Sequence, residues 1–153
     1  MTYGEALRSD TLHEDVHVVL GSVGSPAMFL REGAAEYLSH GNRVHSWCSE
    51  AQPWRRGLSL TTLLLDASFE RCDPYMSYLV AASFVGFLLR RGGAREFLRL
   101  YEAPPGRTEQ TLREVYGAGS ADLEAEWREF LQHAAWDVTP SDLPAGGDPT
   151  RSR

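Results

Sequence analysis

The chain contains no lysine, and all fifteen of its basic side chains are arginines. It also has no extended basic run, and its formal net charge is -6. A surface that binds nucleic acid or anionic lipid needs a local concentration of positive charge. We therefore expect no nucleic-acid partner and no membrane partner.

Cysteine is scarce, and Cys48 and Cys72 lie too far apart in the sequence to form a C-x-x-C motif. This spacing argues against both a disulfide scaffold and a thiolate zinc site, and it favours a reducing compartment. Long apolar runs are missing too, because none approaches the roughly 18 residues of a membrane span. No basic segment followed by an apolar segment precedes His13. We expect a soluble, cytoplasmic protein.

The length of 153 residues suits one domain, and the 42% of apolar residues is ordinary for a globular core. We assign residues 1–138 to this domain. The remaining segment, 139–153, is rich in proline, glycine, aspartate and arginine. That composition predicts a disordered tail.

Helical periodicity runs through most of the chain, and no segment has the alternation of a convincing strand. We predict a mainly α fold of about six to seven short helices, with a loop from Asn42 to Gly57. The predicted helices cover 9–20, Pro26 to near Gly41, 58–69, Pro74 to Gly92-Gly93, 94–103, 108–117 and 120–136. The predicted N-caps are Ser9 or Asp10, Ser59, Thr108 and Ser120.

The first predicted helix contains the segment HEDVH, which places His13 and His17 four residues apart. At this spacing the two rings project from nearly the same face, about 40° apart, and can reach one ion. Glu14 lies at the flank of that face, where a general base can contact water beside the ion. The pattern predicts a zinc hydrolase site. The alternative is a chance arrangement in a helical partner-binding protein.

A zinc ion held by two imidazoles alone would lack ligands, so a third donor is needed. Glu32 and Glu36 have the same four-residue spacing on the second predicted helix. If the two helices pack antiparallel, either carboxylate can bind the ion while the other accepts a hydrogen bond from a ligand histidine. The small residues at 33–35 permit close approach to another helix, which a solvated acidic face does not need.

These segments resemble a known family. HEDVHVVL, followed after a short spacer by PAMFLREGAAEYL, resembles the H-E-x-x-H and W-L-x-E-G-x-A-E-Y motifs of gluzincin metallopeptidases, in particular the peptidase MA-like group. GLSLTTLLL, YLVAASFVGFLLRRGG and TLREVYGAGSADLEAEWREFL are similar to further segments of that family. The resemblance spans Leu12 to Leu131, with Phe29 in the place of the family's tryptophan.

The resemblance implies a zincin-like helical domain that holds Zn²⁺ and hydrolyses a peptide or protein substrate. It implies that His13, His17 and Glu32 are the metal ligands. It also implies that Glu14 is the general base and acid, and that Glu36 contacts a ligand histidine. The short spacer between His17 and Glu32 leaves Glu36 as an alternative third ligand.

Tyr78 matches the tyrosine that heads the family's S-F-V helix. The resemblance makes it a candidate donor to an oxyanion, because a phenol hydroxyl can donate to developing negative charge. A core tyrosine with a satisfied hydroxyl is the alternative. His40 continues the spacing of Glu32 and Glu36, and we expect it to interact with the dipole at the helix end rather than with the metal.

Enzymes of this family place a β-sheet before the first histidine, whereas twelve residues precede His13 here. We expect either an incorrectly assigned start or a minimal form of the family. The second hypothesis for function is therefore a truncated or inactive zincin scaffold that acts as a metal-binding or protein-interaction module. The sequence predicts no oligomeric state.

Overall fold

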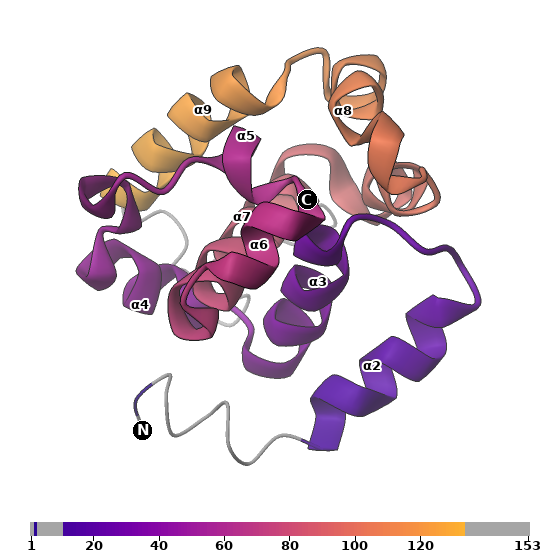
Figure 1. Ribbon diagram of the computed structural model, residues 1–153, viewed down its shortest axis with the longest axis horizontal. Helices are drawn as coiled ribbons and strands as arrows, with labels where there is room; N and C mark the ends of the chain where they lie inside the picture. The colour runs from indigo at the N-terminus through magenta and orange to yellow at the C-terminus, as the bar shows by residue number, and fades with distance from the viewer. Residues whose placement is uncertain (1, 3–10, 134–153) are drawn as a thin grey trace, which may run out of the picture.

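The computed structural model describes Thr2 and residues 11–133 (Figure 1). Within these residues the chain forms eight α-helices and two short 3-10 helices, and no strand. The prediction of a mainly α fold is confirmed. The elements are α2 (Thr11–Gly21), α3 (Met28–His40), α4 (Arg43–Ala51), η1 (Pro53–Arg56), α5 (Leu60–Leu63), α6 (Asp66–Arg71), α7 (Pro74–Tyr101), η2 (Pro105–Arg107), α8 (Thr108–Tyr116) and α9 (Ser120–Gln132).

Helix α7 is the centre of the fold, and α3, α4, α8 and α9 all pack against it. Every residue from Leu79 to Leu88 is buried, because neighbouring helices cover this segment from several sides. The backbone leaves the helical conformation at Gly93, where φ is 80° and ψ is 175°. This kink confirms the predicted helix end at Gly92-Gly93 and the separate helical segment after it.

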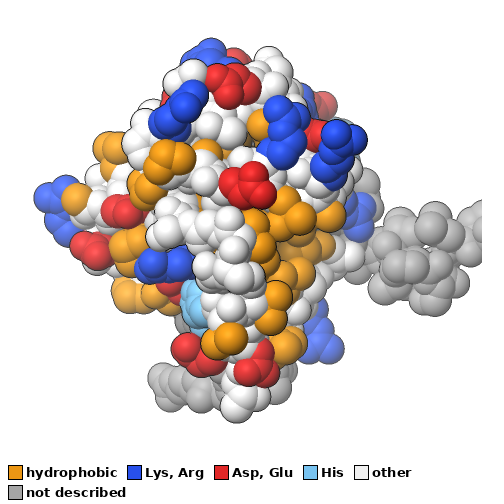
Figure 2. All heavy atoms as spheres, turned by 90° about the vertical axis from the view of Figure 1, so that its right-hand side faces the viewer, with side chains coloured by type: hydrophobic (Ala, Val, Ile, Leu, Met, Phe, Trp, Pro, Cys, Tyr) orange, Lys and Arg blue, Asp and Glu red, His pale blue; other side chains and the backbone are white. Residues whose placement is uncertain are grey.

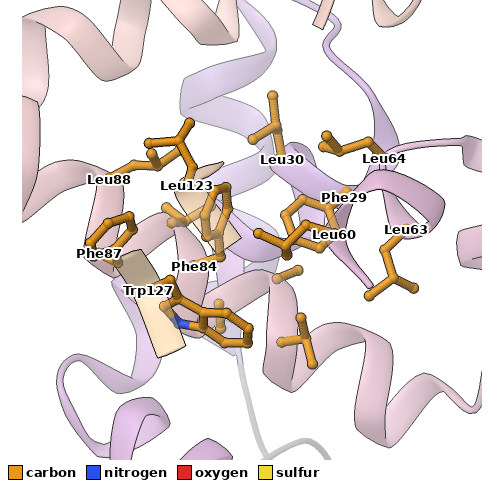
Figure 3. Close-up of a cluster of buried hydrophobic side chains, with 14 of the residues drawn as sticks. Phe29, Leu30, Leu60, Leu63, Leu64, Phe84, Phe87, Leu88, Leu123 and Trp127 are labelled. Atoms are coloured by element: carbon orange, nitrogen blue, oxygen red, sulfur yellow. The ribbon is translucent and has the colours of Figure 1, made fainter. Parts of the chain in front are cut away.

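The hydrophobic core lies where α7 meets α3, α5 and α9 (Figure 3). Trp127 of α9 reaches into it and packs edge-on against the ring of Phe84, with the ring centroids 6.1 Å apart. Such edge-to-face pairs add to the gain from burying the rings. Other side chains of this cluster are Phe29 and Leu30 from α3, Leu60 and Leu63 from α5, Phe87 and Leu88 from α7, and Leu123 from α9.

Helix α3 lies unusually close to α7 because of Gly33. A Cβ atom at this position would lie 2.6 Å from the carbonyl oxygen of Ala81, a distance that real Cβ atoms do not adopt. The small residues at 33–35 are buried on the side of α3 that faces the core, where they allow α3 to pack closely against α7. The prediction of a close helix contact is confirmed, and α7 is the helix that takes part in it.

The predicted loop from Asn42 to Gly57 is wrong, because α4 and η1 occupy most of it. Helix α4 buries Val44, His45 and Cys48, a helical spacing that its polar composition obscures. The predicted helix over 58–69 is divided, because the extended backbone at Leu65 separates α5 from α6.

The capping predictions had mixed outcomes. Ser59 caps α5, and its hydroxyl accepts a hydrogen bond from the backbone N–H of Thr62. Thr108 and Ser120 are the first residues of their helices rather than caps, and α3 begins at Met28, two residues after Pro26. The predicted caps at residues 9 and 10 and the predicted tail over 139–153 lie outside the described residues.

Helix α2 lies at the periphery and makes its main contacts with α3 (Figure 1). Val16 is its buried residue, and Leu20 packs against the core at its C-terminal end. Leu12, Val18 and Val19 of the same helix are exposed. The histidines of this helix therefore sit at the boundary between α3 and solvent.

Candidate metal centre

The two histidines of α2 meet the two glutamates of α3. His13 contacts both Glu32 and Glu36, and His17 contacts Glu32. His13 contacts Glu36 and His17 contacts Glu32, so α2 and α3 run antiparallel, which is the condition that the predicted site requires. The four-residue spacing on each helix brings both pairs to one interface.

Three donor atoms converge at this interface. His17 Nε2 lies 2.9 Å from His13 Nε2. Glu32 Oε2 lies 3.3 Å from His13 Nε2 and 3.2 Å from His17 Nε2. Ligand atoms around a tetrahedral ion with bonds of about 2.0–2.1 Å are themselves roughly 3.3–3.4 Å apart. The separations are close to these values. His13, His17 and Glu32 form a group that could hold a metal ion.

The contact at the second ring nitrogen of His13 fits the same arrangement. A neutral imidazole carries a proton on only one of its two ring nitrogens. His13 Nδ1 faces Glu36 Oε1 at 2.9 Å, and a proton on Nδ1 would leave Nε2 without one. In that tautomer the lone pair would be on Nε2, the atom that lies next to His17 and Glu32. A cation among the three donors would satisfy this lone pair and the carboxylate together.

Glu36 differs from Glu32 because both of its oxygens face histidines. Oε1 contacts His13, and Oε2 lies 3.4 Å from His40 Nε2. The Glu36 side chain is almost completely buried. The geometry thus places Glu32 next to the Nε2 atoms of both His13 and His17, and Glu36 on the far side of the His13 ring. His40 reaches this carboxylate, a contact that the expected interaction with the helix dipole did not include.

Arg31 holds the other oxygen of Glu32. Its Nε lies 3.2 Å from Glu32 Oε1, while Oε2 faces the imidazoles. The arginine fixes the orientation of the carboxylate, so that one oxygen is turned toward the histidines. Arg31 was not among the residues predicted to contribute to the site. Its position directly before Glu32 was the available signal.

Glu14 lies beside the cluster on the exposed side of α2. Within the described part of the chain it forms no hydrogen bond or ion pair, so its carboxylate is accessible to a substrate or to water. The structure therefore brings three of the predicted residues into one donor set and leaves Glu14 next to it. Its predicted role as a base stays a prediction.

Tyr78 of α7 is near this cluster, although no hydrogen bond joins it to the donor atoms. Its ring stacks on Phe69, with centroids 5.6 Å apart. Burial raises the pKa of Tyr78, the charges of Glu32 and Glu36 raise it further, and Arg31 opposes them. The phenol is protonated at neutral pH and can donate a hydrogen bond. Its predicted role as an oxyanion donor stays a prediction.

The centre is accessible from outside. The side chains of His13 and His17 are 14% and 23% exposed, whereas that of Glu36 is 2% exposed. Figure 2 shows a histidine side chain at the surface among acidic and basic side chains. An accessible edge of this kind is what a catalytic metal site needs, because one coordination position must stay open to water or substrate.

Comparison of the chain with known protein families, with curated proteins and with solved structures found no match. The relation to gluzincin peptidases is therefore a resemblance of motifs. Among the helices in the described part of the chain, none is both long enough and apolar enough to cross a membrane.

Proposed function

We propose that the protein is a zinc-dependent, metallopeptidase-like hydrolase of gluzincin type that acts on peptide bonds. The observation that carries this proposal is the convergence of His13 Nε2, His17 Nε2 and Glu32 Oε2 with separations of 2.9 to 3.3 Å. Two imidazoles and one carboxylate are the donor set of many catalytic zinc sites. The motif resemblance supports the same function.

The donor set fits zinc better than the harder divalent cations, which prefer sites made of oxygen ligands. A bound zinc ion would supply a Lewis acid that polarises a carbonyl and lowers the pKa of water. Glu14 accepts the proton of the attacking water and passes it to the leaving amine. Tyr78 donates a hydrogen bond to the oxyanion. Glu36 holds His13 in the tautomer that directs Nε2 to the metal.

The test of this mechanism is Glu14→Gln, which removes the base and keeps the size of the side chain. We expect the variant to retain zinc and to lose hydrolysis of an unstructured peptide mixture by at least about 100-fold. Asp15→Asn is the matched control, because Asp15 is the exposed neighbouring carboxylate. Full activity of Glu14→Gln would contradict the mechanism.

A second candidate function is a non-catalytic, metal-binding interaction module. The exposed Leu12, Val18 and Val19 of α2 favour it, because large apolar side chains exposed beside a site are typical of contact surfaces. Such a module would bind zinc through the same three residues. It would show no hydrolysis with any peptide substrate, and Glu14→Gln would change nothing.

A further inference from the structure

Arg31 orients Glu32 through Nε, and the proposed hydrolysis does not use the two terminal amino groups of its guanidinium. Its side chain is 40% exposed and contacts Glu32 through Nε. Among the described residues, Glu32 is the carboxylate that forms an ion pair with this guanidinium. A guanidinium has five N–H donors, so its two terminal amino groups keep their donors for another ligand.

Glu32 connects this guanidinium to the metal centre. One oxygen of the carboxylate lies against Arg31 and the other against the two imidazoles. An anion bound to the terminal amino groups of Arg31 would therefore lie next to any group bound at the centre. One molecule that carries both groups could reach both positions.

Two phenols share the electrostatic environment of Arg31. Burial is the main cause that raises the pKa of Tyr78 and of Tyr101, and the positive charge of Arg31 opposes this rise in both. Both phenols are protonated at neutral pH. A protonated phenol carries no negative charge that would compete for the guanidinium.

We propose that Arg31 binds a carboxylate of the substrate, so that the preferred substrate is a peptide whose terminal carboxylate lies close to the scissile bond. This inference rests on the proposed function, because it assumes that the centre binds a metal ion. A planar guanidinium binds a carboxylate through two parallel hydrogen bonds, which gives both charge and geometric specificity.

The test compares two small probes on the full chain loaded with Co²⁺, whose visible absorption reports ligand binding at the metal. Succinate carries two carboxylates, and succinamate replaces one of them with an amide of the same shape. With saturating Co²⁺, we expect the wild type to bind succinate at least about tenfold more tightly than succinamate, which is the gain from one charge-assisted pair. The Co²⁺ affinity of each protein is measured in the same titration.

Two variants at position 31 separate charge from geometry. Arg31→Gln should lose the preference for succinate, and Arg31→Lys should keep part of it, because lysine supplies the charge without the planar fork. Arg99→Gln is the matched control: its guanidinium pairs with Glu96 on an exposed face of α7, and it should keep the full preference.

The outcomes distinguish this inference from the function on which it rests. Equal binding of the two probes by the wild type, or an unchanged preference in Arg31→Gln, would overturn the role of Arg31 and leave the metal centre intact. Failure of the wild type to bind Co²⁺ would overturn both.

Discussion

The histidines at two sites in this molecule, one at the edge of the fold and one in its core, have opposite surroundings. His13 and His17 lie at the edge of the fold, with carboxylates around them and part of each ring exposed. His45 of α4 is completely buried. Its Nδ1 lies 3.0 Å from the hydroxyl of Ser83, which also accepts a hydrogen bond of 3.0 Å from the indole N–H of Trp127.

The difference shows what makes a histidine a candidate ligand. Burial, with the charge of Arg90 as a smaller cause, lowers the pKa of His45 to about 3, so its ring is neutral and serves the core. The outer pair keeps access to solvent and faces anionic oxygens, which suits a cation. Substitutions in the outer cluster should therefore change the affinity for metal. Substitutions around the buried His45 should change the stability of the fold instead.

The largest expected effect separates the two groups directly. His17→Ala removes one of three donors and should weaken zinc binding by more than about 100-fold. His45→Asn keeps a polar side chain in the core and should leave zinc affinity unchanged. Competition with a chromophoric chelator measures both variants. Equal affinities would remove the distinction between the two groups.

A smaller effect is expected at Glu36, which contacts a ligand but is placed outside the donor set. Glu36→Gln should weaken zinc binding by about 10- to 100-fold, the usual cost of losing a partner of a ligand histidine. Glu32→Gln should cost more than Glu36→Gln in the same titration. The reverse order would make Glu36 the third ligand.

The buried group should affect stability alone. Ser83→Ala removes the hydroxyl that accepts from Trp127, and a buried donor left without a partner costs about 1–3 kcal/mol. Urea unfolding of the metal-free protein measures this loss in the free energy of unfolding. Zinc affinity should stay at the wild-type value, and a parallel loss of zinc binding would couple the two regions.

Acid should reveal the neutral state of His45. Its pKa is about 3 in the folded chain and about 6.5 in an unfolded chain. Between these values the unfolded state binds the additional proton, so stability falls as the pH decreases below about 6.5, by up to roughly 1.4 kcal/mol per pH unit. Metal-free wild type should lose stability more steeply than His45→Asn over this range. Parallel curves would contradict the lowered pKa.

The smallest effect is expected at an exposed carboxylate far from any histidine. Burial acts against the ionised form of Glu109, but hydrogen bonds from Ser120 and the charge of Arg113 together lower its pKa. Because this group is largely exposed, Glu109→Gln should change the free energy of unfolding by less than about 1 kcal/mol. A loss comparable to that of Ser83→Ala would show that exposure does not govern these interactions.

Much of the fold and of the centre follows from local spacing. The intervals from His13 to His17 and from Glu32 to Glu36 each place two side chains on one helix face, and a short connection makes the helices antiparallel. The partner of Gly33 could not be predicted from the sequence, because it depends on which helix packs against this residue. The carbonyl of Ala81 is 48 residues away in sequence, and periodicity within one segment contains no information about such a contact.

Other features were missed because their signals depend on the tertiary structure. Helix α4 has a polar composition, and only the packing of Val44, His45 and Cys48 shows its buried face. The role of His45 likewise depends on Ser83 and Trp127, which come from two other helices. Sequence patterns predicted groups within one or two helices, whereas groups assembled from three helices required the structure.

The most direct test is metal analysis of the protein purified without a chelator, with His13→Ala beside the wild type and His133→Ala as the control at an exposed histidine of the α9 C-terminus. We expect one equivalent of zinc in the wild type and in His133→Ala, and almost none in His13→Ala. Wild-type protein that binds no zinc, or His13→Ala that retains a full equivalent, would contradict it.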